Sequence, residues 1–382
     1  MVLPARHVIL ALTLCVCLVG CGAQSPPKPD TSPASKEDEN AKTRAAYPQA
    51  VAEDLEALEA RLGRPLDLTV DPVLQAAVEQ ALQESGKPGA ALVIDAKQGA
   101  VLALHEVPGI EPHPLTAATH PASTMKTLLA LAGIHEKVLS FDETIKCEQD
   151  YSPVAGFYCF AKHGLMTLDR ALVTSCNVFF FEVANRLDVD NIATHFAHFG
   201  IGQATGIELP EPLGILPDRK WYEAHGGYEK KHALTMGIGH GEISVTPLQL
   251  ARAYTAVSTG KLPKLTLLRS KTEVGDREVS ALPYDESSLA KVRKALLASV
   301  TDEGGTARQA AVSGLDIAGK TGTAEGKPLD KEVPPPANGW FAGFAPAEDP
   351  QVVVVVYIEG GGPGGVSAAP IAGKIFSAWN TR

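Results

Sequence analysis

The stretch HPASTMKTLLALAG, residues 120–133, places Ser123 three residues before Lys126 at the start of an apolar run. A serine hydroxyl is a weak nucleophile at neutral pH and needs a base within hydrogen-bond reach. A lysine provides that base only where burial or a nearby cation keeps its amine neutral. Residues three apart on a helix lie one turn from each other on one face. The stretch is therefore compatible with nucleophilic catalysis, although taken alone it fits a polar helix cap better.

The same serine–lysine spacing occurs four times, at Ser25/Lys28, Ser123/Lys126, Ser258/Lys261 and Ser288/Lys291. Ser25 lies among prolines, where no pocket can form. Ser258 lies at a helix exit, and Ser288 opens an amphipathic helix whose basic residues face solvent. Only Ser123 is followed by an apolar run that would bury the helix carrying its lysine. The spacing alone does not identify the nucleophile among the four serines, so the surrounding sequence has to identify it.

Two other short motifs occur once each and carry polar groups of the kind that assist a nucleophilic serine. SCN, residues 175–177, lies between two helical patterns, and KTGT, residues 320–323, lies in a predicted strand. Singly, the first fits a turn between helices and the second an exposed strand edge. In the order SxxK, SxN, KTG, the three match the signature of penicillin-binding proteins and serine β-lactamases. Their presence selects Ser123 over the other three serines.

The resemblance covers about residues 67–382. The segments that resemble the transpeptidase domain of class B penicillin-binding proteins are LTVDPVLQ, GAALVIDAKQGAVLAL, SCNVFFFEVANRL, TGIELPEPLGILP, GIGHGEISVTPLQLARAY, AGKTGTAE and GWFAGFAP. The resemblance implies an α+β fold of the β-lactamase/transpeptidase type, with a five-stranded antiparallel sheet flanked by helices and a mainly helical subdomain. It also implies a peptidoglycan D,D-transpeptidase or D,D-carboxypeptidase that acts on D-Ala-D-Ala stem peptides through a serine acyl-enzyme and binds penicillin covalently.

The resemblance assigns a role to each polar residue of the three motifs. Ser123 would attack the carbonyl of a D-Ala-D-Ala stem peptide or of a β-lactam, and Lys126 would accept the serine proton. Ser175 would pass a proton toward the leaving amine, while Asn177 would hold the Ser/Lys arrangement and the substrate amide. Lys320 would supply positive potential. As a second cation near the same pocket, it would also disfavour the charge on Lys126.

The rest of the KTGT strand would bind the substrate. Thr321 and Thr323 would hydrogen-bond the substrate carboxylate. Gly322 would be small because a substrate backbone lying along the strand must approach closely. The backbone N–H groups of Ser123 and Thr323 would form the oxyanion hole. No cofactor is predicted.

Two alternatives to a transpeptidase follow from the same motifs. The first is a β-lactamase, in which water resolves the acyl-enzyme. Class A enzymes carry ExxLN and class D enzymes carry YGN, and neither string occurs here; a class D-like enzyme with a carboxylated Lys126 remains the closest version. The second is a non-catalytic lipoprotein that binds peptidoglycan or senses β-lactams. In such a protein the three motifs would be present but would not catalyse acylation.

Local patterns predict the elements that position these residues. The run ALVIDAKQGAVLALHE predicts a hairpin, and residues 123–199 are predicted to be mainly helical. Thr246, Pro247 and Gln249 form the start signal of a further helix, with a capping box. Near the C-terminus, LDIAGKTGTAE, GWFAGFAP and VVVVVYIEG predict strands, and AAPIAGKIFSAWN predicts a closing helix. Strands near both ends of the chain predict one antiparallel sheet beside a helical region.

The N-terminal region predicts export. Residues 1–21 contain one basic residue and an apolar stretch too short to span a bilayer, and they end in LVGC. This ending resembles a lipoprotein processing box in which Cys21 is lipidated; the alternative is a cleaved secretory signal. Residues 22–46 are rich in Pro, Ser and charge and predict a disordered tether. Residues 47–66 predict an amphipathic lead-in helix, and residues 67–382 the transpeptidase domain. We therefore expect a lipid-anchored protein whose domain lies in the periplasm or extracytoplasmic space.

The remaining cysteines, the histidines and the charge set further expectations. In an oxidising compartment Cys147 and Cys159 could pair as a disulfide, the alternative being unpaired thiols, and Cys176 is expected to be a small buried residue. His195 and His198 have ligand-like spacing but no third ligand, so no metal site is predicted. The net charge of -10 and the lack of a clustered basic face argue against nucleic acid as a partner. The expected partners are stem peptides, β-lactams and, through Cys21, a lipid membrane.

Overall fold

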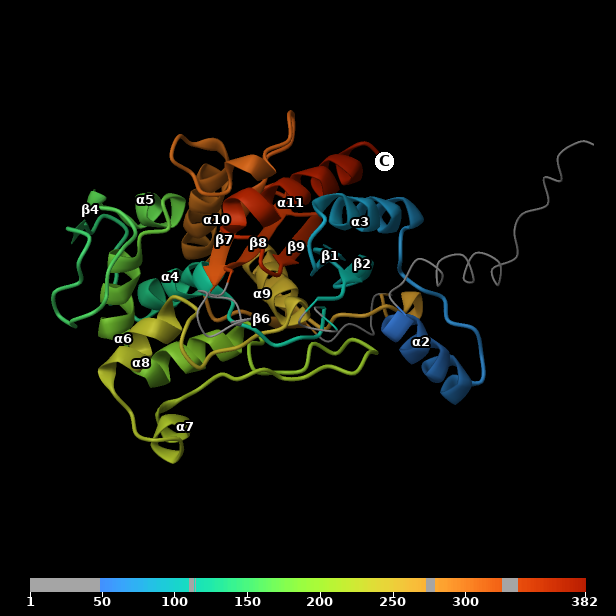
Figure 1. The fold of residues 1–382 in the computed structure, drawn as a ribbon, viewed down its shortest axis with the longest axis horizontal. Helices are drawn as coiled ribbons and strands as arrows, with labels where there is room; N and C mark the ends of the chain where they lie inside the picture. The colour runs from blue at the N-terminus through green and yellow to red at the C-terminus, as the bar shows by residue number, and fades with distance from the viewer. Residues whose placement is uncertain (1–48, 110–112, 114, 273–278, 325–335) are drawn as a thin grey trace, which may run out of the picture. The chain divides into compact units, whose positions relative to one another are not determined.

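A five-stranded antiparallel sheet is built from the two ends of the domain. The computed structural model describes residues 49–109, 113, 115–272, 279–324 and 336–382, all within one compact unit. The strand order is β2-β1-β9-β8-β7 (Figure 1). The strands are β1 (Gly89–Asp95), β2 (Val101–Val107), β7 (Ala318–Ala324), β8 (Asn338–Ala345) and β9 (Val352–Ile358). The predicted hairpin, the three C-terminal strands and the fold class are confirmed.

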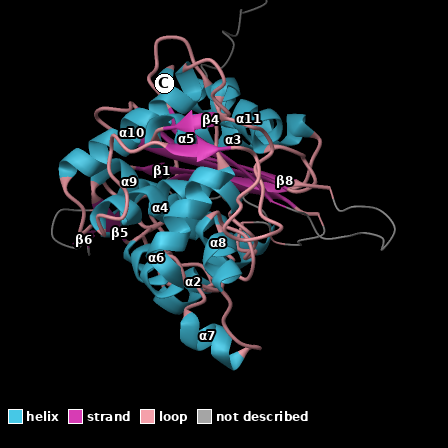
Figure 2. Ribbon diagram, turned by 90° about the vertical axis from the view of Figure 1, so that its left-hand side faces the viewer, coloured by secondary structure: helices cyan, strands magenta, loops and turns pink. Residues whose placement is uncertain are grey.

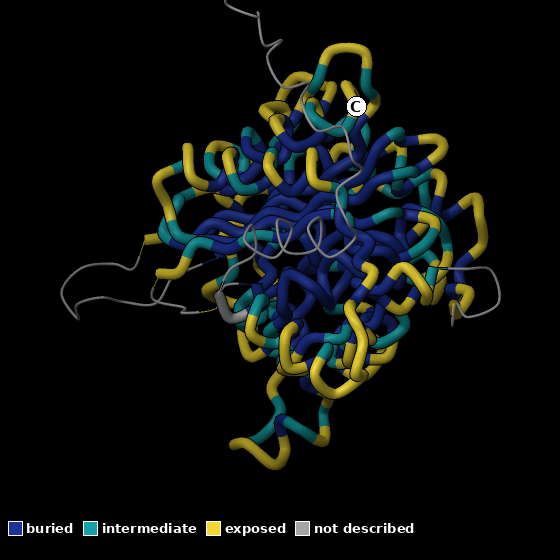
Figure 3. The backbone as a smooth tube through the Cα atoms, turned by 90° about the vertical axis from the view of Figure 1, so that its right-hand side faces the viewer, coloured by how far each residue is buried: buried dark blue, intermediate teal, exposed yellow. Residues whose placement is uncertain are grey.

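Helices cover both faces of the sheet, which is why β9 is apolar along its whole length. Val352, Val354 and Val356 pack into the core beneath α3 (Pro72–Ser85) and α11 (Gly364–Asn380). Val353, Val355 and Tyr357 lie in the other core, which includes α9 (Pro247–Thr259). Figure 2 shows the sheet edge-on between these helices, and Figure 3 shows its strands buried. A strand covered on both faces needs no polar alternation.

The middle of the chain forms the predicted helical region. Its elements are α4 (Lys126–His135), α5 (Leu168–Val173), α6 (Asn177–His198), α7 (Arg219–Ala224), α8 (Lys230–Gly237) and α10 (Glu286–Thr301), with short 3-10 turns η1 (Ala122–Met125), η2 (Arg269–Lys271) and η3 (Arg308–Ala310). Two short hairpins interrupt it, made by β3 (Ile145–Cys147) with β4 (Gly164–Met166) and by β5 (Lys261–Pro263) with β6 (Val279–Ala281). The patterns of residues 123–199 predicted mainly helices and missed the β3–β4 hairpin, and no strand was predicted at β5 or β6, because three-residue strands carry almost no periodic signal.

Helix α9 confirms the start signal read from the sequence. The Thr246 side chain accepts the Gln249 N–H, and the Gln249 side chain returns to the Thr246 N–H, with Pro247 at the first helical position. At its other end Gly260 adopts φ 74°, a left-handed conformation that closes the helix without steric cost. The capping residues thus set both ends of a helix that lies almost wholly in the core.

The described N-terminal part begins with α2 (Gln49–Leu62), which lies within the predicted lead-in helix. The expected signal peptide, lipidated Cys21 and tether all lie outside the described residues. No helix in the described ranges is long and apolar enough to cross a lipid bilayer.

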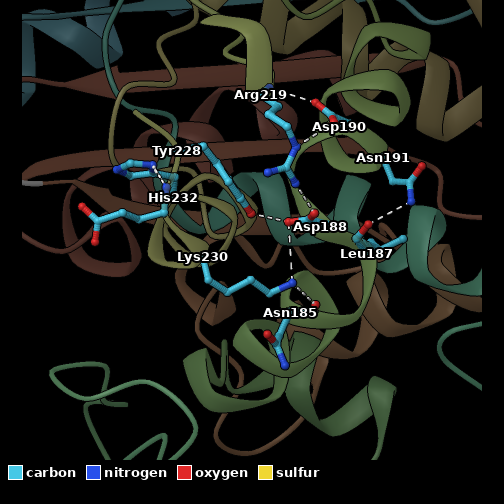
Figure 4. A network of polar contacts seen from close by, with 10 residues as sticks. Asn185, Leu187, Asp188, Asp190, Asn191, Arg219, Tyr228, Lys230 and His232 are labelled. Carbon is cyan, nitrogen blue, oxygen red and sulfur yellow. Dashed lines mark hydrogen bonds and ion pairs between the residues drawn. The ribbon is translucent and has the colours of Figure 1, made fainter. Parts of the chain in front are cut away.

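A charged network fixes a break in α6. Asp188 adopts φ 65° and ψ 165° between the two helical segments of α6. Its carboxylate accepts hydrogen bonds from Tyr228 and, at 2.5 Å, from Arg219, and it lies 3.6 Å from the Lys230 amine (Figure 4). Arg219 also stacks its guanidinium over the Tyr228 ring at 3.9 Å. These contacts tie α7 and the start of α8 to the middle of α6.

Candidate active site

Ser123 lies on the 3-10 turn η1, and the α-helix α4 begins at Lys126. The predicted helix start is therefore correct in place, with a tighter first turn than expected. Ala122, just before the serine, has φ 51° and is fully buried. This is a left-handed conformation that costs an L-residue energy and that glycine adopts freely. Ser123 itself is half-buried, so its hydroxyl remains within reach of a ligand.

Three neighbouring segments hold the turn that carries Ser123. The Ala122 N–H donates to the Gly239 carbonyl at 2.9 Å. The Trp340 indole on β8 donates to the His120 carbonyl at 3.0 Å, and the Tyr254 hydroxyl on α9 donates to the Thr124 carbonyl at 2.9 Å. Sequence motifs did not reveal Trp340 or Tyr254, because each acts on a backbone carbonyl from a distant segment. The turn that carries Ser123 is thus held by the sheet, by α9 and by the segment around Gly239.

Lys126 is completely buried and its amine is held by the SCN motif. Nζ lies 2.6 Å from the Asn177 Oδ1, 2.8 Å from the Ser175 carbonyl and 3.3 Å from the Ser175 Oγ. Ser175 adopts φ 57° in the turn between α5 and α6, which turns both its carbonyl and its hydroxyl toward the amine. The structure therefore brings together the first and second sequence motifs, 49 residues apart, around one amine.

Burial makes the amine of Lys126 a weaker base than the amine of an ordinary lysine. Desolvation lowers its pKa to about 8, against an opposing effect from the sulfurs of Cys159 and Cys176. The pKa of Lys320 also lies well below its usual value, because of burial first and of repulsion from Lys126 second. The expected repulsion between the two cations thus lowers the pKa of Lys320. Burial is the main cause of the lowered pKa of both lysines. A largely buried amine with a pKa near 8 is partly neutral at physiological pH and can accept a proton.

The KTGT motif occupies β7, an edge strand of the sheet. Lys320 is buried and its amine donates to the Thr321 carbonyl at 3.1 Å. The Thr321 hydroxyl donates to the Thr306 hydroxyl at 2.9 Å, and the exposed Thr323 accepts the Gly364 N–H at 3.2 Å. Thr306 was not foreseen, since nothing in its local sequence links it to the strand. Among the described residues no strand pairs with the outer edge of β7, the kind of edge to which an extended peptide can add.

Gly322 has a structural reason to be small besides the one expected from a substrate. A Cβ at this position would lie 2.9 Å from the Pro121 carbonyl oxygen and 3.2 Å from the Thr124 methyl. Both atoms belong to the turn around Ser123. Any side chain at Gly322 would therefore push the third motif away from the first.

The other described serines of the same spacing have structural roles. Ser258 is buried in α9 and donates to the Thr255 carbonyl at 2.9 Å. Ser288 lies in the first turn of α10, where its N–H and hydroxyl both bond to Asp285, the helix cap. Ser25 lies outside the described residues.

Cys147 and Cys159 do not form the disulfide that the sequence analysis considered; both are free thiols. Their sulfurs instead lie 3.6 Å and 3.4 Å from the same atom, Nδ1 of His163. Cys176 is a third buried free thiol, which agrees with its expected burial. The three sulfurs and the imidazole nitrogen of His163 lie within 4.8 Å of one another, so Cys147 and Cys159 are not an isolated pair.

The two histidines with ligand-like spacing serve other contacts. His195 Nδ1 lies 2.7 Å from the Tyr284 hydroxyl, and its Nε2 lies 2.9 Å from the Glu136 carboxylate. Both ring nitrogens of His195 are therefore engaged by protein groups. The His198 ring packs edge-on against it.

Comparison with known proteins places the chain in a family. A model of the penicillin-binding protein transpeptidase domain matches residues 89–377. The chain belongs to the penicillin-binding protein transpeptidase family. The matched range contains all three motifs, at residues 123–126, 175–177 and 320–323.

Curated relatives agree with this placement. The chain is 29% identical to peptidoglycan D,D-transpeptidase MrdA of Acinetobacter baumannii, over 83% of this chain and 54% of the relative. It is 27% identical to peptidoglycan D,D-transpeptidase FtsI of Escherichia coli, over 85% of this chain and 58% of the relative. The chain thus spans just over half the length of these relatives.

A solved structure supports the fold in the same way. The structure of PBP2 from Pseudomonas aeruginosa, in complex with WCK 5153, superposes with a TM-score of 0.72 at 27% identity. The match covers 82% of this chain and 78% of that one. The shared fold therefore accounts for most of both chains.

Proposed function

We propose that the chain is a serine-type peptidoglycan D,D-transpeptidase or D,D-carboxypeptidase, with Ser123 as its nucleophile. The observation that carries the proposal is the buried amine of Lys126, whose lowered pKa suits a base and which the SCN motif holds one turn from Ser123. Relatives named as peptidoglycan D,D-transpeptidases support a stem peptide ending in D-Ala-D-Ala as the substrate. A β-lactam would acylate the same serine.

The contacts around Lys126 suit a proton relay. The neutral amine takes the proton of the Ser123 hydroxyl as its oxygen bonds to the substrate carbonyl carbon. The Ser175 hydroxyl, 3.3 Å from the same amine, donates its proton to the nitrogen of the leaving D-Ala and takes up the proton that Lys126 received from Ser123. Breaking the peptide C–N bond then leaves an ester on Ser123 and free D-Ala. An amine from a second stem peptide resolves the ester in transpeptidation, and water resolves it in carboxypeptidation.

The strand β7 would bind the other end of the substrate. Lys320 would supply positive potential once an arriving substrate carboxylate stabilises its charged form, and Thr321 and Thr323 offer hydroxyl groups beside it. The N–H groups of Ser123 and Thr323 would bind the developing oxyanion. The two threonine hydroxyls already form hydrogen bonds within the protein, with Thr306 and with Gly364. We expect hydrogen bonds to the substrate carboxylate to replace them when the substrate binds.

The test is covalent labelling with a fluorescent penicillin, followed by timing of label release. Stable labelling is expected for the wild-type chain and for Ser258→Ala, which removes a serine of identical spacing outside the site. Ser123→Ala should not label. Rapid release of the label would instead show a β-lactamase, and absence of label in the folded wild-type chain would show a non-catalytic binder.

We also propose that the protein is exported and lipid-anchored through Cys21, with its domain in the periplasm or extracytoplasmic space. The proposal rests on the signal-like residues 1–21, the LVGC ending and the Pro- and Ser-rich tether of residues 22–46. Cells grown with an alkyne fatty acid should label the wild-type chain and Cys17→Ser but not Cys21→Ser. Labelling of Cys21→Ser would contradict the anchor.

A further inference from the structure

A cavity lies where two turns of the central sheet meet the end of α9. It has a volume of about 520 Å³, within the range of about 300–1,000 Å³ that is common for small-molecule sites. Its walls come from the β1–β2 turn, the β8–β9 turn, the last turn of α9, the strands β5 and β6, and the first half of α10. None of its lining residues belongs to the SxxK, SCN or KTGT motif. The proposed acylation chemistry therefore gives this cavity no role.

Arg293 is the largely buried cation in the part of the wall that α10 contributes. Its side chain is 12% exposed. Its Nε donates to the Val257 carbonyl at 2.9 Å, and its Nη1 donates to the Glu286 carboxylate at 2.6 Å. Among the described residues no acceptor takes the N–H groups of Nη2, so these donors remain for a ligand. A guanidinium with unused donors in a cavity wall suits a carboxylate.

The charges of the cavity balance except for one cation and one anion. Three cationic side chains line it, and so do three carboxylates. Two of each are joined in ion pairs, Arg293 with Glu286 and Lys97 with Asp349. The exposed Lys261 and Glu348 remain, and neither has an ion-pair partner among the residues that the structure describes. The cavity therefore offers one unpaired charge of each sign to a ligand.

The rest of the lining includes apolar groups. Ala96 follows β1, Pro263 ends β5 and Pro350 precedes β9, and all three are buried. Val279 of β6 adds an apolar side chain that is 39% exposed. A ligand with a charge of each sign and a short apolar segment between them matches both parts of the lining. An ion of one sign only would leave Lys261 or Glu348 unpaired.

We propose that this cavity binds, without covalent chemistry, a short peptide that carries one ammonium group and one carboxylate. The carboxylate lies against Lys261 and Arg293, and the ammonium group lies against Glu348. The source of the peptide rests on the proposed function: stem peptides carry both groups, because they supply the acceptor amine and end in a carboxylate. A second stem held here keeps the enzyme on its polymeric substrate and raises the local concentration of stems near Ser123.

Calorimetric titration of the full chain tests the cavity after penicillin has blocked Ser123. The probe is Nα-acetyl-L-lysyl-D-alanine, which carries one ammonium group and one carboxylate and lacks a D-Ala-D-Ala bond. We expect one probe molecule to bind per chain. Acetylating the side-chain amine or amidating the carboxylate should each weaken binding about tenfold, the effect of losing one charge-assisted hydrogen bond. Absence of binding, or a probe masked at both groups that binds as tightly as the charged one, would overturn the proposal.

Substitutions of the two unpaired charges assign the ends of the probe. Lys261→Met and Glu348→Gln should each weaken binding about tenfold, whereas Lys220→Met, which changes an exposed lysine on α7, should bind like the wild type.

Amidation of the probe should matter less in Lys261→Met, and acetylation should matter less in Glu348→Gln, because each variant already lacks part of the contact. Losses that simply add, or variants that bind like the wild type, would place the probe elsewhere and overturn the proposal. A folded chain that never labels with penicillin would refute the proposed function instead, and titration of that unlabelled chain would still test the cavity.

Discussion

Two groups of charged residues in this molecule place their charges in opposite environments. Around Asp188, near the surface, each charge meets an opposite one: Arg219 and Lys230 both contact its carboxylate, and the three side chains are 36–43% exposed. At the candidate active site Lys126 and Lys320 are wholly buried, and neither has a carboxylate partner among the described residues. The first arrangement stabilises charged forms, and the second destabilises them.

The difference indicates that the Asp188 group has a structural role and that the buried lysines are suited to catalysis. A paired surface carboxylate keeps its charge over the working range of pH and contributes to joining α6, α7 and α8. A buried lysine without an anion loses its proton readily, which is the property a general base requires. Both groups also contain a non-glycine residue at positive φ, Asp188 in one and Ala122 in the other. Backbone strain alone therefore does not mark the functional site, whereas unpaired buried charge does.

The largest effect is expected from removing the buried base. Lys126→Met should slow penicillin acylation by roughly a thousandfold, because general-base catalysis contributes on that order. Lys126→Arg should be equally slow, since a guanidinium keeps its proton and cannot serve as a base. Labelling rates measured at saturating fluorescent penicillin check both variants.

Lys230→Met is the matched control from the surface network and should acylate at the wild-type rate. If Lys126→Arg acylates as fast as the wild type, Lys126 is not the general base, and it does not differ in role from the structural Lys230.

The pH dependence of acylation should follow the buried amine. With a pKa of about 8 for Lys126, the neutral fraction at pH 6 is about one hundredth of its limiting value, so the rate should rise about a hundredfold from pH 6 to pH 9. Stability should move in the same direction. Between about pH 8 and the ordinary lysine pKa of 10.5 the unfolded chain binds more protons than the folded one at this group, so Lys126 contributes stability that grows with pH.

Second-order acylation rates between pH 6 and pH 9 provide the measurement. A rate that stays flat across this range in a folded chain would mean that Lys126 is not the group that takes the serine proton.

Much of the site could be predicted from the sequence because its motifs are short and locally complete. SxxK, SCN and KTGT each lie within one turn or one strand, so their types and order carried the family resemblance. Contacts made between distant segments left no such trace. Trp340 binds the turn of Ser123 through a backbone carbonyl, and Asp188 meets Arg219 only because α6 breaks.

The cysteine cluster was missed for the same reason. Its side chains come from a strand end, a loop and a helix cap, so their approach to one another depends on the tertiary fold. A disulfide was the simpler reading of Cys147 and Cys159, because a sequence does not say how far apart two sulfurs lie.

Breaking the surface network should lower stability and leave the chemistry alone. Asp188→Ala removes the acceptor for Tyr228 and Arg219 and leaves an alanine at φ 65°, and we expect it to lower the free energy of unfolding by about 1–3 kcal/mol. Asp188→Asn should cost less, because asparagine keeps one side-chain carbonyl oxygen as an acceptor for these donors. Urea unfolding measures both.

Acylation by the folded fraction should change less than twofold in either variant. A tenfold slower acylation in fully folded Asp188→Asn would show that this network supports the active site after all.

The smallest effect tests the strain that the two regions share. Ala122→Gly should raise the free energy of unfolding by up to about 1 kcal/mol, because relief of a left-handed alanine outweighs the added chain entropy of glycine. Asp188→Gly relieves a similar φ yet should destabilise, because it also deletes the contacts with Arg219 and Tyr228. Opposite signs for the two substitutions in urea unfolding would show that strain is compensated by side-chain contacts at Asp188 and uncompensated at Ala122. Equal signs would mean that the backbone alone sets the cost at both positions.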